Sequence, residues 1–183
     1  IAAVIEVSPG APTVETVPVP DGAPPSETAP GSVPTDSASD AVANITGDAL
    51  PVFDPSVVDT AIGMPAPAVV GHDRSGNEVA IAPATGPHLV LFVAHWCPHC
   101  AADLPHVIEW MADGTIPQRL PATLVSTAES ATAANYPADT WLQEHGWPSP
   151  EIRDPSRGDG AAGEVATAYG TSGSPHYVLI GAD

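Results

Sequence analysis

The order of apolar and polar positions predicts alternating strands and helices over the later two thirds of the chain. Residues 63–81 hold a short apolar run, the turn DRSGN and a second short run, EVAI, which together predict a β-hairpin. The next block, PHLVLFVAH at residues 87–95, is a continuous apolar run bounded by proline. Such a run is typical of a fully buried central strand.

A helix is predicted directly after that strand, from Pro98 to about Met111. Its apolar positions recur at i, i+3, i+4 and i+7 on one face, and they are Leu104, Val107, Ile108 and Met111. Gly114 is well placed to end this helix. Later strands are predicted at PATLVSTA, EIRD and HYVLI, and short helices at ADTWLQEHG and over residues 161–169. The alternation implies an α/β sheet protein.

The N-terminal part has a different pattern, because residues 8–50 are rich in Pro, Ala, Thr, Ser and acid and show no periodicity. We predict a disordered extracytoplasmic linker over residues 1–55 and a folded domain over residues 57–183. The apolar residues 1–7 fit either the end of a signal or anchor helix or the start of a mature chain. The last residues, LIGAD, read as a strand and a turn, so we expect the C-terminal end of the fold to be truncated.

The net charge of the chain argues against some classes of binding partner. The formal net charge is -18, from 22 acidic residues against four arginines and no lysine. A surface this negative repels phosphates, which argues against nucleic acid and against polybasic docking on anionic lipid. No segment reaches the roughly 18–20 apolar residues of a membrane span.

Two cysteines, Cys97 and Cys100, are the candidates for chemistry, and their short spacing indicates a redox pair or a metal pair. At the predicted strand–helix junction, Cys97 takes the N-cap and Pro98 the first helical position. The unpaired backbone N–H groups and the helix dipole stabilise a negative sulfur there, which lowers the thiol pKa. Cys100 lies one turn on, within disulfide reach. We expect Cys97 to be exposed and Cys100 to be buried.

The residues around the pair are predicted to tune it. The His99 ring favours the Cys97 thiolate, and a more stable thiolate stabilises the reduced pair. Pro98 and His99 together are therefore expected to make the disulfide a better oxidant. Trp96 is expected to cover the site with apolar surface.

The motif FVAHWCPHC, followed by an amphipathic helix, resembles the active site of the thioredoxin superfamily. Its CPHC is similar to that of the DsbA disulfide oxidases, whereas residues 63–81 resemble the N-terminal hairpin of the TlpA/ResA redoxin branch. The end of the chain, TSGSPHYVLIGAD, resembles that branch's cis-proline loop. The resemblance implies a thioredoxin-like α/β fold with a central mixed sheet flanked by helices. It also implies a cis Pro175 against the Cys97 sulfur and a Ser174 backbone that pairs with an extended substrate.

Three departures from the TlpA/ResA pattern qualify the resemblance. That branch commonly has a proline directly before the second cysteine and acts as a reductant, but His99 stands there in this chain, which favours oxidation. Many relatives carry a buried carboxylate that assists proton transfer, for which Glu78 is the candidate. The closing strand hairpin and final helix of the family have no counterpart in these residues.

We therefore expect a monomeric, bacterial thiol–disulfide oxidoreductase in the periplasm or at the cell surface, secreted or membrane-anchored. It would act on protein thiols and disulfides, be recycled by a membrane partner, and need no organic cofactor or metal. Two alternatives stay open. One is a copper metallochaperone that binds metal through the two thiolates, with the histidines at 95, 99, 106 and 176 as further candidate ligands. The other is an anchored interaction domain without turnover.

Overall fold

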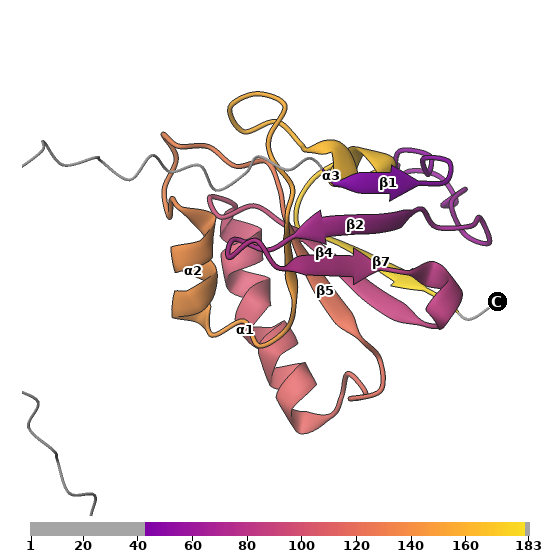
Figure 1. Cartoon of the computed structure of the whole chain (residues 1–183), viewed down its shortest axis with the longest axis horizontal. Helices are drawn as coiled ribbons and strands as arrows, with labels where there is room; N and C mark the ends of the chain where they lie inside the picture. The colour runs from indigo at the N-terminus through magenta and orange to yellow at the C-terminus, as the bar shows by residue number, and fades with distance from the viewer. Residues whose placement is uncertain (1–42, 182–183) are drawn as a thin grey trace, which may run out of the picture. The chain divides into compact units, whose positions relative to one another are not determined.

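The computed structural model of the protein describes residues 43–181 (Figure 1). The predicted linker up to residue 42, with its anchor segment, lies outside the described residues, as do residues 182–183. Within residues 43–181, no helix has both the length and the apolar character needed to cross a bilayer.

A small antiparallel sheet is built from β1 (Asn44–Thr46), β2 (Ala68–His72) and β3 (Glu78–Ile81), in that order. The predicted hairpin is confirmed, with Val69 opposite Ile81 and His72 opposite Glu78. Its turn is closed by Asp73, whose carboxylate accepts the backbone N–H groups of Ser75 and Asn77, each at 2.8 Å. Such Asx turns are the reason for the DRSGN signature.

The main sheet has four strands in the order β6 (Glu151–Arg153), β5 (Ala122–Ser126), β4 (His88–Val93) and β7 (His176–Ile180). Strands β6, β5 and β4 are parallel, and β7 runs antiparallel to β4. The predicted central strand is confirmed as β4, which pairs on both sides.

Alternate side chains of β4 point to opposite faces of this sheet and divide the core in two. On one face, Leu91 and Val93 pack with α1 (Pro98–Asp113) and α2 (Ala138–His145), the two helices drawn side by side in Figure 1. The cluster on this face includes both cysteines. The predicted helix therefore buries its apolar face directly behind the cysteine motif.

On the opposite face, Val90 and Phe92 pack with α3 (Glu164–Ala168) and with the apolar side of the small sheet. The two sheets come close where Gly71 of β2 faces Ile152 of β6, since a Cβ on Gly71 would lie 2.7 Å from the Ile152 side chain. A glycine at this position lets the two backbones approach.

The folded region begins earlier than residue 57, so the prediction of a linker over residues 1–55 is wrong for its last part. Strand β1 lies within that range, and Ala43 and Leu50 are buried in the core. The backbone N–H groups of Leu50 and Phe53 donate to carbonyl oxygens at the end of α3, both at 2.8 Å. The sequence gives no sign of these long-range bonds, because the segment lacks periodicity.

Helix α3 is shorter than the predicted range 161–169, and Asp154 explains its start. The Asp154 carboxylate accepts two N–H groups from the first turn of α3, each at 3.0 Å. Gly170 follows the helix at φ +66°, and a Cβ there would collide with the carbonyl oxygen of Pro51. Only glycine fits where the N-terminal segment crosses the end of α3.

Three parallel strands, an antiparallel fourth strand and a long helix after the central strand make up a thioredoxin-like α/β fold. The predicted fold class is confirmed for residues 43–181.

Candidate active site

The two cysteines lie where β4 gives way to α1, as predicted. Cys97 is the N-cap of α1 in an extended conformation, and Pro98 is the first helical residue. The Cys97 sulfur accepts the backbone N–H of Cys100 at 3.5 Å, which satisfies a donor of the first turn that has no helical partner. This geometry places the sulfur at the positive end of the helix.

The two thiols differ in pKa. Burial raises the pKa of the Cys97 thiol, but hydrogen bonds from the backbone and side chain of Cys100, the Ser174 side chain and the His99 backbone outweigh it and hold the pKa below its ordinary value. Burial raises the pKa of the Cys100 thiol to about 12. A negative charge is therefore more stable on Cys97 than on Cys100.

The expectation that Cys97 is exposed is wrong, because both cysteines are buried, at 4 % and 0 % exposed. The chain segment before β7 lies against Cys97, where the thiol donates to the Ser174 carbonyl oxygen at 3.2 Å. The predicted cis peptide bond between Ser174 and Pro175 is confirmed. The structure thus brings Ser174, 77 positions away in sequence, to the reactive sulfur.

The residues flanking the pair are more exposed than the cysteines. Trp96 is 39 % exposed, and its indole N–H donates to the Ala128 carbonyl oxygen at 2.7 Å. Pro98 and His99 are also exposed. His99 contributes to the Cys97 sulfur through its backbone.

His176, two positions after Ser174, has a packing role. Its ring lies edge-on to Phe53 at 5.5 Å and to Phe92 at 6.2 Å. Burial lowers the pKa of His176, although Asp59 raises it in part. Through Phe53, the segment after β1 reaches the strand that follows the Ser174 loop.

The candidate carboxylate Glu78 is exposed, so the structure does not bury it beside the cysteines. The structure buries Asp154 instead and half-buries Glu151, and burial raises the pKa of Glu151 to about 7. The guanidinium of Arg74, in the hairpin turn, lies 3.7 Å from a carboxylate oxygen of Glu151 and 2.7 Å from one of Glu129. Sequence reasoning missed this cluster, because its members come from separate elements and share no motif.

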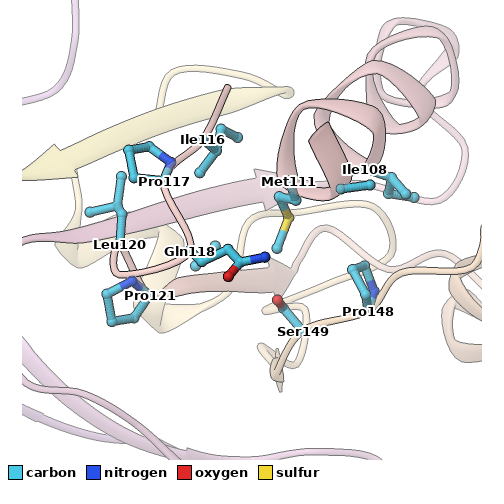
Figure 2. Close-up of a pocket in the computed structure, with 11 residues that line it drawn as sticks. Ile108, Met111, Ile116, Pro117, Gln118, Leu120, Pro121, Pro148 and Ser149 are labelled. Carbon is cyan, nitrogen blue, oxygen red and sulfur yellow. The ribbon is translucent and has the colours of Figure 1, made fainter. Parts of the chain in front are cut away.

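A cavity lies at the C-terminal end of α1, away from the cysteines (Figure 2). It is a largely apolar cavity of about 400 Å³ between the last turns of α1, the loop that follows and the segment before β6. Its lining includes Ile108, Met111, Pro117, Leu120 and Pro148. No cysteine or titratable group lines it, so it offers no chemistry for exchange.

The copper alternative was based on the presence of thiol and imidazole side chains that suit a soft metal. Among residues 43–181, no three His, Cys, Asp or Glu side chains are grouped closely enough to hold a metal ion.

No protein-family model matches this chain, and no curated protein matches it. It is similar to the solved structure of a hypothetical protein from Sinorhizobium meliloti 1021, at 19 % identity and a TM-score of 0.48, over 75 % of this chain and 66 % of that one. It is also similar to a secreted Mycobacterium tuberculosis disulfide oxidoreductase, at 18 % identity and a TM-score of 0.47, over 60 % of this chain and 73 % of that one. A third similar structure is the thioredoxin domain of a Bacteroides vulgatus thiol-disulfide oxidoreductase, at 19 % identity and a TM-score of 0.49, over 65 % of this chain and 80 % of that one.

Proposed function

We propose that this protein is a thiol–disulfide oxidoreductase that exchanges disulfides with protein substrates outside the cytoplasm, in the oxidising direction. One observation carries the proposal. The Cys97 sulfur is the N-cap of α1 and accepts the N–H of Cys100, which stands one turn further along the same helix. Disulfide exchange requires such a pair, with one sulfur stabilised as a thiolate and a second within reach.

The oxidising cycle begins with a Cys97–Cys100 disulfide. A substrate thiolate attacks the Cys97 sulfur, a mixed disulfide forms, and Cys100 leaves and takes up a proton. A second substrate thiolate then attacks the substrate sulfur of the mixed disulfide, and Cys97 leaves as a thiolate. The substrate loses two electrons to the cysteine pair and becomes a disulfide, so exchange needs no organic cofactor.

The low pKa of the Cys97 thiol supports this direction. A stabilised thiolate stabilises the reduced pair, which raises the reduction potential, and a thiol of low pKa is also the better leaving group. The exposed His99 occupies the position next to Cys100, where its ring can tune the thiolate further.

The loop at Ser174 and the N-terminal segment would have supporting roles in this cycle. The Ser174 backbone and Pro175 would border the groove for an extended substrate segment, because they lie at the Cys97 sulfur. The acidic N-terminal segment would tether the domain at the cell surface or in the periplasm. A membrane protein would then reoxidise the cysteine pair after each turnover.

The reduction potential of the Cys97–Cys100 couple tests the direction. We expect equilibration with glutathione buffers to give a potential well above the value of about -270 mV for thioredoxin. A potential near that value would overturn the oxidising assignment. Refolding of a reduced, disulfide-requiring protein tests the activity itself, with Cys97→Ser as the control. Equal rates for the two proteins would overturn it.

A further inference from the structure

The loop after β5, residues 127–136, borders the cysteine pair. At its start, Ala128 packs against the apolar cluster that contains both cysteines. At its end, the Tyr136 ring lies edge-on to the ring of His95, with 5.9 Å between ring centroids. Tyr136 and Trp96 are 51 % and 39 % exposed, so the loop and the turn before α1 each present an accessible aromatic ring.

His95 holds the middle of this loop through both ring nitrogens. The ring is 1 % exposed, its Nδ1 lies 2.8 Å from the Ala134 carbonyl oxygen, and its Nε2 accepts the Ser130 backbone N–H at 3.1 Å. A backbone N–H only donates and a carbonyl only accepts, so Nε2 is bare and Nδ1 carries the hydrogen. The contacts therefore require a neutral ring in one tautomer.

Two further bonds fasten the ends of the loop to the residues before Cys97. The Asn135 side chain donates to the His95 carbonyl oxygen at 2.9 Å, and the Trp96 indole donates to Ala128 at 2.7 Å. Ala128 and Asn135 both have positive φ, at 52° and 63°. An alanine side chain disfavours the left-handed conformation, so the surrounding contacts must hold Ala128 in it.

We propose that His95 is a positioning residue for exchange at Cys97: its neutral ring holds loop 128–136 against Trp96, so that Trp96, Tyr136 and the loop form a fixed wall for the cysteine-bearing segment of a protein partner. The inference rests on the proposed function. Both ring nitrogens are bonded to backbone groups, so His95 does not donate or accept the proton of the exchange. It acts on the affinity for the partner.

The test compares His95→Leu, which removes both ring bonds, with His95→Gln, whose amide keeps one donor and one acceptor. We expect His95→Leu to raise KM for a reduced protein substrate about tenfold, the effect of about one lost hydrogen bond. We expect kcat and the rate of Cys97 alkylation by iodoacetamide to stay within about twofold. His95→Gln should restore most of the lost affinity.

The matched control is His88→Leu, at the first residue of β4, the strand that precedes His95. His88 is also buried, and its Nε2 lies 2.9 Å from the hydroxyl of Thr123, which is in β5 and outside the loop. We expect this control to lower the thermal midpoint without changing KM. If His95→Leu left KM unchanged, or if KM, kcat and alkylation changed together as the protein lost stability, the positioning role would be overturned.

Two spectroscopic measurements on the wild-type protein keep the inference testable if His95→Leu fails to fold or if no exchange activity is found. Long-range ¹H–¹⁵N spectra should show His95 protonated on Nδ1 and bare on Nε2 at neutral pH. The Trp96 indole N–H, assigned with Trp96→Phe, should exchange slowly with solvent. An Nε2–H tautomer or an imidazolium would overturn the inference whatever the outcome for the proposed function.

Discussion

The two ends of helix α1 are closed in different ways. At the C-terminal end the chain turns back through Gly114 at φ +83°, and the Ile116 N–H bonds to the Trp110 carbonyl oxygen at 2.8 Å. At the N-terminal end the donor of Cys100 is left to a sulfur. At the C-terminal end, backbone groups of nearby residues bond to one another. At the N-terminal end, a side chain that can carry a negative charge accepts the backbone N–H.

The surroundings of the two ends differ accordingly. The C-terminal end borders the apolar cavity of Figure 2, whose residues contribute packing. The N-terminal end borders a network of polar contacts from Ser174, Trp96 and His95. We therefore expect reactivity at the end of α1 where a side-chain sulfur accepts a backbone N–H that has no helical partner. Changes at that end should alter exchange, and changes at the other should alter stability.

The largest effect is expected from Cys97→Ser. Exchange with protein substrates should fall to the uncatalysed rate, because the hydroxyl is not a thiolate nucleophile at neutral pH. The thermal midpoint should move by less than about 4 °C, since the change is nearly isosteric. Turnover assays and thermal unfolding of the reduced proteins check both parts. Residual turnover above background would contradict the assignment of Cys97.

Cys100→Ser should abolish turnover, because no Cys97–Cys100 disulfide can form, but it should leave the Cys97 thiolate able to attack an oxidised protein. Without a second thiol, Cys97 stays joined to the substrate, and the mixed disulfide accumulates. Mass spectrometry after mixing with an oxidised protein should detect a one-to-one covalent adduct that dithiothreitol removes. An adduct on Cys100 in the reciprocal variant, formed at an equal rate, would reverse the two roles.

The lowered pKa of the Cys97 thiol predicts that iodoacetamide reacts with it several-fold faster at pH 7 than with the unfolded chain. Because the folded pKa lies below the unfolded value, Cys97 stabilises the reduced protein above the unfolded pKa. That contribution is lost as the pH falls through the folded pKa. Alkylation rates measured from pH 4 to 9 should give a midpoint below about 8.5. A midpoint at or above the unfolded value would refute the helix-end effect.

The smallest effect is expected at the cavity. Met111→Ala should lower the free energy of unfolding by about 1–2 kcal/mol, because the half-buried side chain loses part of its apolar contacts. The reduction potential and the alkylation rate of Cys97 should stay unchanged. Denaturant titrations and redox equilibration measure the two quantities. A shift in the reduction potential would break the contrast between the two ends.

Much of the fold could be predicted, because its elements follow local rules. The hairpin turn at Asp73, the N-cap at Cys97 and the helix end at Gly114 each depend on residues within a few positions. The exposure of Cys97 and the start of the folded region could not be predicted. Both depend on segments far away in sequence, the Ser174 loop in one case and the end of α3 in the other.

By itself, the sequence determined the chemistry available to this protein: two thiols one helical turn apart, at a helix start that stabilises an anionic sulfur. The tertiary structure alone decided what surrounds those thiols, including the Ser174 carbonyl oxygen, the loop bonded to His95 and the burial of Cys97. The physical reason is the range of the interactions. Capping and turns involve neighbours in the chain, whereas burial and hydrogen-bond partners depend on how distant segments pack.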